Sequence, residues 1–206
     1  MNRFRTHTGL VAPLDRSNID TDQIIPKQFL KRIERSGFGQ FLFYDWRHGS
    51  SGEIEPEFVL NQARYQSTSI LVTGKNFGCG SSREHAVWAL SDFGFRVVLA
   101  PSFADIFANN AAKNGLLTVA LSPGQVTELV RRAREGEPYR LTIDLEQQKV
   151  SDAQGFSAEF QMDNFVRHCL LEGLDHIGLT LEHEEEIARY EARHPLPSRV
   201  RIAFHR

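Results

Sequence analysis

The sequence has few cysteines, no excess of charge of either sign and no long apolar run. Its two cysteines in 206 residues cannot form the disulfide framework of a small secreted protein. The 24 basic and 26 acidic residues give a net charge of −2, and no basic cluster stands out, so a nucleic-acid surface is not expected. No segment approaches membrane-spanning length, and no apolar stretch follows the N-terminus as in a signal peptide. We expect a cytoplasmic protein that binds neither nucleic acid nor membrane.

The scarcity of thiols also restricts the cofactors that the chain can hold. An iron–sulfur cluster needs four cysteine thiolates, or three where one iron stays open for a substrate, and the sequence has only Cys79 and Cys169. Cys169 lies in an apolar helical stretch and is expected in the core, whereas Cys79 is expected to be a small filler. No second histidine stands at ligand spacing from His85. We expect no metal or cofactor on this chain, so that a cluster-dependent family member takes its cluster from another chain.

Strands and helices alternate in the second half of the sequence. Residues 96–100 and 116–121 are apolar runs typical of buried strands, and a helix opened by residues 101–103 and ending at Lys113 is predicted between them. Ser122 and Pro123 then mark the start of a helix that reaches Arg134. This alternation predicts an α/β fold with a parallel sheet flanked by helices.

The remaining segments predict further strands and helices in one domain, residues 1–206. Strands are expected over residues 7–14, 69–73, 139–144, 149–150 and 156–160, and helices over residues 162–174 and 177–192. The strands near residue 145 have the spacing of a hairpin. Residues 1–60 include an irregular lobe, and residues 194–206 are expected to be a C-terminal extension.

The chemically richest segment is residues 74–86, GKNFGCGSSREHA. A predicted strand leads into it and an amphipathic helix leads out. Its glycines allow a tight turn and a close approach to a ligand, and the helix start offers unpaired N–H groups and the positive end of the helix dipole. Arg83 adds a guanidinium suited to a carboxylate or a phosphate. The segment therefore predicts an anion site, interpreted as a carboxylate-binding catalytic loop.

A second interpretation of this segment is purely structural. Ser81 and Glu84 have the spacing of a capping box, in which their side chains satisfy backbone donors at the helix start. The segment is not a Walker loop, because no Gly-Lys-Ser/Thr follows, nor a dinucleotide fingerprint, because Arg83 stands where the third glycine belongs. The residues alone leave capping and anion binding open, and they indicate no particular reaction.

The N-terminal part contains three less specific features. Asp20 and Asp22 stand among turn-forming residues and are most simply loop and cap residues. Residues 27–35, KQFLKRIER, predict a short basic helix. Residues 37–56 are rich in glycine and aromatic side chains, which indicates either an exposed interface or a packed loop.

Two motifs resemble those of a known family. Residues 80–86, GSSREHA, are similar to the signature of the mobile C-terminal domain of aconitase-type hydro-lyases. Residues 18–30, NIDTDQIIPKQFL, resemble the N-terminal segment of isopropylmalate isomerase small subunits. The motifs follow each other in the expected order, and the resemblance covers about residues 1–190. It implies the swivelling β/β/α fold of the aconitase C-terminal type, which agrees with the predicted sheet.

The resemblance also implies an activity and a partner. The implied reaction is the dehydration and rehydration that interconverts 2-isopropylmalate and 3-isopropylmalate in leucine biosynthesis. A large subunit would carry the [4Fe-4S] cluster as a Lewis acid. This chain would be the small subunit of the heterodimer and would contact the small dicarboxylate substrate.

Individual roles follow from the same resemblance. Ser81 matches the base that takes the proton from carbon, and a helix N-terminus and Arg83 favour its anion. Ser82 and Arg83 match substrate-binding residues, and Asp22 matches an aspartate that orients an active-site group across the domain interface. The residues expected to support the loop are Gly78, Gly80, Glu84 and His85.

Residues 27–35 match the loop that selects the substrate side chain in the family. Phe29 and Leu30 are candidates to meet the isopropyl group, and Lys31 or Arg32 to bind the distal carboxylate, although each could equally be a core or surface residue. Two alternatives for the whole chain stay open. It could serve a related hydro-lyase, namely a homoaconitase, citramalate or dimethylmalate dehydratase, or it could be a noncatalytic anion-binding assembly module.

Overall fold

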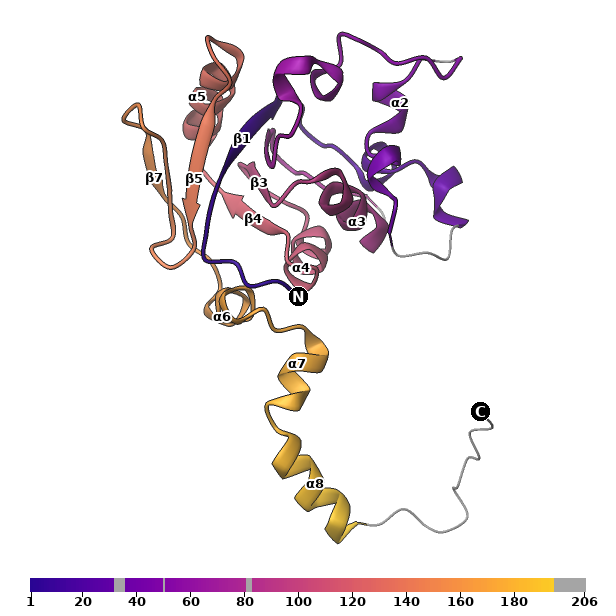
Figure 1. Ribbon diagram of the computed structural model, residues 1–206, viewed down its shortest axis with the longest axis vertical. Coiled ribbons are helices and arrows are strands. Elements are labelled where there is room, and N and C mark those ends of the chain that lie inside the picture. The colour runs from indigo at the N-terminus through magenta and orange to yellow at the C-terminus, as the bar shows by residue number, and fades with distance from the viewer. Residues whose placement is uncertain (32–35, 50, 81–82, 195–206) are drawn as a thin grey trace.

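The computed structural model describes residues 1–31, 36–49, 51–80 and 83–194. These residues form a seven-stranded sheet in the order β4-β3-β2-β1-β5-β6-β7, with helices on both faces (Figure 1). The strands are β1 (Thr6–Leu14), β2 (Ile70–Thr73), β3 (Val97–Ala100), β4 (Leu117–Ala120), β5 (Arg140–Asp144), β6 (Lys149–Ser151) and β7 (Ser157–Glu159). The predicted α/β class is confirmed: the sheet is parallel at its core and flanked by helices.

Strand β1 joins a parallel half of the sheet to an antiparallel half. Strands β1 to β4 pair in parallel, with Val11 opposite Ile70 and Val97 opposite Leu117. On its other side β1 pairs with β5 in the antiparallel direction, and β5, β6 and β7 follow as hairpins, as expected. Strands β2 and β3 are buried throughout, because both faces of the parallel half are covered.

The two faces of the parallel half carry different helices. Helices α3 (Glu84–Phe93) and α4 (Asp105–Lys113) cover one face, and α5 (Pro123–Arg134) covers the other. Helix α5 begins as predicted, with the Ser122 side chain accepting from the N–H of Gln125 in a capping box. Helix α4 begins later than predicted, because the N–H of Ala104 bonds to the carbonyl of Phe77 and keeps this segment extended.

The chain between β1 and β2 forms the irregular lobe that the sequence predicted. It contains α1 (Thr21–Ile24), α2 (Tyr44–Arg47) and the short 3-10 helices η1 (Lys27–Lys31), η2 (Gly39–Phe41), η3 (Val59–Asn61) and η4 (Ala63–Tyr65). Phe38 and Phe43 are fully buried there, and Phe41 and Trp46 pack against the same core. The aromatic segment is therefore a packed loop. The predicted basic helix is η1, and residues 32–35 lie outside the described residues.

The C-terminal part differs most from expectation. Helix α6 (Asn164–Glu172) is shorter than predicted, because Asp163 caps its start and Gly173 adopts a left-handed conformation at its end. The single helix predicted over residues 177–192 is wrong: α7 (His176–Leu181) and α8 (Glu184–Arg193) are separate, and His183 between them departs from helical geometry. The expected extension from residue 195 lies outside the described residues. In the described ranges, no helix is both long and apolar enough to cross a membrane.

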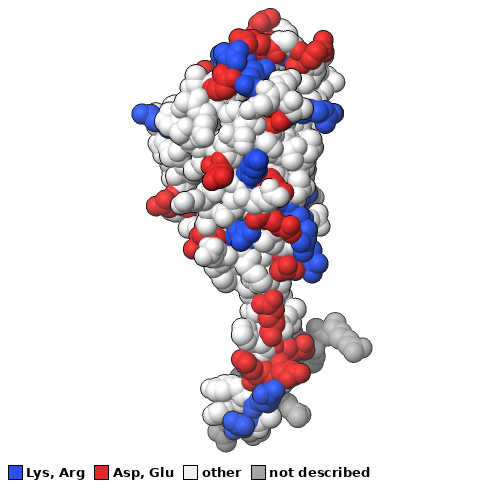
Figure 2. Space-filling model, turned by 90° about the vertical axis from the view of Figure 1, so that its left-hand side faces the viewer, with Lys and Arg blue, Asp and Glu red and all other residues white. Residues whose placement is uncertain are grey.

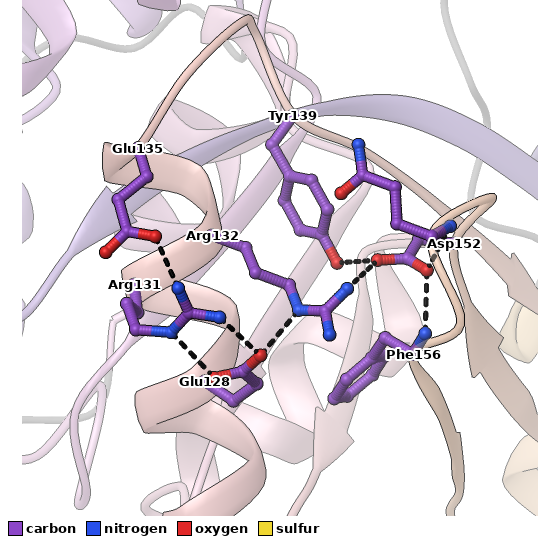
Figure 3. A network of polar contacts seen from close by, with 8 residues as sticks. Glu128, Arg131, Arg132, Glu135, Tyr139, Asp152 and Phe156 are labelled. Carbon is purple, nitrogen blue, oxygen red and sulfur yellow. Dashed lines mark hydrogen bonds and ion pairs between the residues drawn. The ribbon is translucent and has the colours of Figure 1, made fainter.

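A buried carboxylate ties α5 to the antiparallel half of the sheet (Figure 3). The Asp152 side chain is 1% exposed and accepts hydrogen bonds from the Tyr139 hydroxyl at 2.6 Å and from Nη1 of Arg132 at 2.9 Å. The N–H of Phe156 bonds to the other carboxylate oxygen at 2.8 Å. Arg132 also donates from Nε to Glu128 at 2.7 Å. Because burying a carboxylate is costly unless it is paired and hydrogen-bonded, these contacts are required for this packing.

Candidate active site

The glycine-rich loop, described over residues 74–80, lies at the carboxyl ends of three neighbouring parallel strands. It leaves β2 and runs between the loops that follow β1 and β3. The N–H of Gly78 donates to the carbonyl of Ile19 at 2.8 Å on one side, and the N–H of Phe77 donates to the carbonyl of Ser102 at 3.1 Å on the other. Ligands of open α/β sheets bind at this edge, so the loop has the position of a functional site.

The backbone of the loop requires glycine at two positions. Gly78 and Gly80 have φ values of +75° and +88°, which other residues rarely adopt. A Cβ on Gly78 would lie 2.2 Å from the ring of Phe107 in α4, so side-chain packing excludes any larger residue as well. These two positions therefore shape the described part of the loop, and their support of a catalytic site stays a prediction.

Two asparagines, which the sequence analysis did not single out as site residues, also hold the loop. Asn18 and Asn76 both have a positive φ, of 56° and 59°, and their side chains share a hydrogen bond of 2.9 Å. The N–H of Asn76 donates to the Ser102 hydroxyl at 2.9 Å. Asparagine tolerates a left-handed backbone better than most residues. The position of Asn76 within the glycine-rich segment could therefore have indicated its role in the loop.

Helix α3 begins at Glu84, with Arg83 in the N-cap position and in an extended conformation. The capping box predicted for Ser81 and Glu84 is wrong, because it requires Glu84 in the third helical position and not the first. No described side chain caps the helix. The positive end of the α3 dipole therefore lies next to Arg83, and helix N-termini favour anions. Ser81 and Ser82 lie outside the described residues.

Arg83 and Asp22, predicted as separate site residues, are in direct contact. Nη1 of Arg83 donates a hydrogen bond to Oδ1 of Asp22, and Nζ of Lys27 lies 3.1 Å from Oδ2 of the same carboxylate. The Arg83 side chain is only 19% exposed, whereas that of Lys27 is 71% exposed. One carboxylate thus holds two cations beside the glycine loop. Lys27 was not predicted as a site residue, although its place in the basic segment after Asp22 was a signal for it.

The short helix α1 positions Asp22. Asp20 caps α1: its carboxylate accepts from the N–H of Gln23 at 2.7 Å, and the Gln23 side chain accepts from the N–H of Asp20 at 3.0 Å. Thr21 and Ile24 are buried and anchor the helix. The cap role expected for Asp20 is confirmed, while Asp22 points its carboxylate to Arg83.

Glu84 contacts the end of α4, whereas His85 contacts the lobe and its own helix. Nδ2 of Asn114, at the end of α4, lies 3.4 Å from Oε1 of Glu84. The His85 ring packs edge-on against Phe38 at 5.3 Å and lies 4.7 Å from the Trp88 ring. Burial and the nearby Arg83 charge, partly offset by Glu84, lower the pKa of His85, so His85 is neutral at neutral pH. Support of the glycine loop by Glu84 and His85 stays a prediction.

The candidates for side-chain selection lie on η1, directly after the Asp22 helix. Phe29 stacks on Phe41 with ring centroids 4.1 Å apart and meets Tyr44 edge-on at 4.9 Å. Phe29 and Leu30 are half-buried against the core of the lobe, whereas Lys31 is exposed. Part of the Phe29 surface is thus used for packing, in line with the core alternative for this residue, and its contact with a substrate stays a prediction. Arg32 lies outside the described residues.

Both cysteines are protonated thiols at neutral pH. Burial and the nearby Asp20 charge raise the pKa of Cys79, and burial raises the pKa of Cys169. Cys169 is a core residue of α6, as expected. An iron–sulfur cluster takes four cysteine ligands, or three where one iron stays open, and with two cysteines the chain does not fit such a cluster by itself. Across residues 1–31, 36–49, 51–80 and 83–194, no three His, Cys, Asp or Glu side chains are grouped to hold a metal ion.

Three family models match successive parts of the chain. The aconitase C-terminal domain matches residues 1–124, which include the glycine loop and the Asp22–Arg83 contact. The model described as LeuD_N matches residues 127–164. The C-terminal domain of the 3-isopropylmalate dehydratase small subunit matches residues 177–196, which include most of α7 and all of α8.

Similar proteins are found among curated sequences and solved structures. The 3-isopropylmalate dehydratase small subunit of Koribacter versatilis is 60% identical over 94% of this chain and 100% of its own length. That of Brevibacillus brevis is 61% identical with the same coverage. The crystal structure of 3-isopropylmalate dehydratase (leuD) from Methanocaldococcus jannaschii has a TM-score of 0.65 and 22% identity over 90% of this chain and 99% of its own, and it supports the fold alone. The chain therefore belongs to the family of 3-isopropylmalate dehydratase small subunits, which are aconitase-type hydro-lyase subunits of leucine biosynthesis.

Proposed function

We propose that this chain, with a large subunit, interconverts 2-isopropylmalate and 3-isopropylmalate by removing water and adding it back. Dehydration takes a proton from one carbon and hydroxide from its neighbour, and rehydration returns them with their positions exchanged. The family membership supports this reaction. The contribution of this chain is the carboxylate site and the base.

The observation that carries the proposal is the contact of Arg83 with Asp22 at the start of α3, where no described side chain forms a cap. The Asp22 carboxylate keeps the half-buried guanidinium in place, and the remaining N–H donors of Arg83 are suited to a substrate carboxylate through parallel hydrogen bonds. Lys27 shares the same Asp22 carboxylate and adds a second positive charge. A dicarboxylate substrate is therefore attracted to this end of the helix.

Ser81 follows Gly80 directly in the sequence and is proposed as the base. A serine hydroxyl becomes a base only when its surroundings favour the alkoxide, and a helix N-terminus and a guanidinium do so. The proton from the substrate carbon passes to the Ser81 oxygen and returns in the rehydration step. Ser82 is proposed to bind the substrate, and Phe29 and Leu30 to contact its isopropyl group.

The large subunit is proposed to carry the [4Fe-4S] cluster, whose iron would act as a Lewis acid on the departing hydroxyl and a substrate carboxylate. The two cysteines, Cys79 and Cys169, are too few to hold a cluster and lie on different elements, so no cluster is assigned to this chain. The residues of this chain would complete the site from the opposite side.

The test is reconstitution of the full chain with its large subunit, followed by assays of 2-isopropylmalate, citramalate and dimethylmalate. We expect turnover of 2-isopropylmalate with the highest kcat/KM. Exchange of Phe29 for alanine should lower that preference. Preference for another malate would reassign the substrate, and absence of turnover with a cluster-loaded large subunit would overturn the proposal.

A further inference from the structure

The asparagine pair Asn18–Asn76 lies at the junction of the two segments that form the candidate active site. These segments are the chain that follows β1, residues 15–22, and the glycine loop. Both asparagines have a left-handed backbone, with φ values of 56° and 59°, and Nδ2 of Asn76 donates to Oδ1 of Asn18 at 2.9 Å. A residue other than glycine is held in this conformation by its surroundings at a cost in energy, and such residues gather at functional sites. The pair is therefore a candidate for a role in the reaction.

Backbone hydrogen bonds align the two segments in parallel beyond the ends of β1 and β2. The N–H of Asn18 donates to the carbonyl of Lys75 at 2.8 Å, and the N–H of Thr21 donates to the carbonyl of Cys79 at 2.9 Å. Between these two bonds, the carbonyl of Ile19 accepts from the N–H of Cys79 at 3.2 Å. The side-chain bond of the asparagine pair lies at the start of this ladder, where it can fix the register of one segment against the other.

Asn76 also joins the glycine loop to the chain that follows β3. Its N–H donates to the Ser102 hydroxyl at 2.9 Å, and the N–H of Phe77 donates to the carbonyl of Ser102 at 3.1 Å. The N–H of Ala104 in turn donates to the carbonyl of Phe77 at 3.0 Å. Asn76 is half-buried, whereas Asn18 is exposed. The glycine loop is thus held on both sides, and Asn76 takes part in the contacts on each side.

The register of the two segments sets the relative position of the groups that we propose to act on the substrate. Asp22 lies four residues after Asn18, on the first segment. Arg83 lies seven residues after Asn76, beyond the glycine loop, and donates a hydrogen bond to Asp22. Ser81, the proposed base, lies between Asn76 and Arg83 in the sequence. A shift of one segment along the other would therefore displace the carboxylate site and the base relative to each other.

The charge of the protein as a whole gives little help in placing the substrate. The net charge is −2, and Figure 2 shows basic and acidic residues interspersed over much of the face that it presents. A net charge of this sign does not attract a dianion. Binding of a dicarboxylate therefore depends on the short-range contacts of Arg83 and Lys27, whose placement follows from the two segments.

We propose that Asn18 and Asn76 are positioning residues of the reaction, which rests on the proposed function. Their hydrogen bond holds the segment with Asp22 and the loop that leads to the base in the register that catalysis requires. Neither asparagine is assigned a contact with the substrate. Loss of either side chain should therefore lower the rate of the bound substrate more than it changes substrate binding or the stability of the fold.

The test replaces each asparagine by glycine, which adopts a positive φ freely, so that only the side chain is removed. Asn18→Gly, Asn76→Gly and the double variant are assayed as full chains with a saturating large subunit and 2-isopropylmalate. We expect each single variant to lower kcat about fivefold or more, the scale of one net hydrogen bond, and to change KM less than about twofold. Because both single variants break the same bond, kcat of the double variant should lie within about twofold of the less active single variant.

Ser67→Gly is the matched control, because Ser67 is exposed, has a φ of 62° and lies outside the two segments. Its kcat should equal that of wild type. The Tm of all four variants should stay within about 3 °C of wild type, which separates positioning from loss of the fold.

Three outcomes would overturn the proposal while wild-type turnover leaves the proposed function intact. They are an unchanged kcat in either asparagine variant, losses that multiply in the double variant, and a loss of kcat that only accompanies a lower Tm. If the wild-type complex with a cluster-loaded large subunit shows no turnover, both proposals fail.

Discussion

The Arg83 guanidinium donates a hydrogen bond to the Asp22 carboxylate from a position 61 residues further along the chain. Strands β1 and β2 are parallel neighbours, so the loops that follow them meet at one edge of the sheet. The contact joins the two sequence motifs into one site. It also couples Arg83 to Asp22, so a substitution of either residue should affect the same site.

Replacing Arg83 by Lys keeps the charge but loses the planar fork of donors. We expect a loss of about 1.5–3 kcal/mol in transition-state stabilisation, the scale of a charge-assisted hydrogen bond, measured as kcat/KM of the reconstituted enzyme. Arg131→Lys, on the exposed surface of α5, is the matched control and should leave kcat/KM unchanged. An Arg83→Lys enzyme as active as wild type would show that Arg83 is structural.

Replacing Asp22 by Asn keeps the shape of the side chain but removes the charge that holds Arg83 and Lys27. We expect kcat/KM to fall roughly tenfold or more, because a charge-assisted contact is worth at least ~1.5 kcal/mol. The control is Asp15→Asn, since Asp15 forms a looser pair with Arg134 at 3.6 Å in the same loop region. Equal effects of the two substitutions would argue against a specific role for Asp22.

Substitutions of Ser81 distinguish a catalytic role of this serine from a purely structural one. As the base, Ser81→Ala should abolish turnover while the thermal melt and the binding to the large subunit stay unchanged. Ser81→Asp should also be inactive, because a fixed negative charge repels the substrate carboxylates. If the serine has only a structural role, Ser81→Ala should lower the free energy of unfolding by about 1 kcal/mol, the scale of a lost hydrogen bond, and activity should follow the folded fraction. An active Ser81→Asp enzyme would refute the catalytic assignment.

Gly78→Ala should destabilise the protein through two separable effects. The first is the strain of a positive φ, about 1–2 kcal/mol for a residue with a Cβ, and the second is the clash with Phe107 at 2.2 Å. Gly136→Ala isolates the first effect, because Gly136 has φ +62° and open space around it. We expect Gly78→Ala to cost about 1–3 kcal/mol more than this control in urea denaturation. Equal costs would mean that α4 shifts to accommodate the methyl group.

Asp152 makes the free energy of unfolding depend on pH in the acidic range. Burial alone would raise its pKa, but hydrogen bonds from Tyr139, Phe156 and Gln154, and the charge of Arg132, outweigh burial and lower the pKa below 3.8. A carboxyl whose folded-state pKa is lowered stabilises the protein above its unfolded pKa of about 3.9, and this stabilisation is lost as pH falls through the folded-state pKa. The difference in unfolding free energy between wild type and Asp152→Asn should therefore be large at pH 7 and shrink below pH 4. A difference independent of pH would contradict this assignment.

Several features followed from short stretches of sequence. The apolar runs of β2 and β3 predicted buried parallel strands, and Ser122 with Pro123 predicted the start of α5. The GSSREHA and NIDTDQIIPKQFL motifs identified the family. These features depend on hydrogen bonds and side-chain periodicity within a few residues, which the sequence displays directly.

Other features were decided only by contacts between distant segments. The start of α4 moved because residue 104 bonds to Phe77 in the glycine loop, and α3 began at Glu84 and not beside Ser81. The parallel pairing of β1 with β2 brings Asp22 and Lys27 to Arg83 and joins segments about 60 residues apart, and the antiparallel pairing of β1 with β5 joins segments about 130 residues apart. The local preference of a segment for helix or strand does not indicate which strands pair, because the pairing depends on burying both faces of the sheet at once. The sequence by itself thus determined the family and the candidates for carboxylate binding, and the tertiary structure decided which of these candidates meet, because that depends on how distant strands pair.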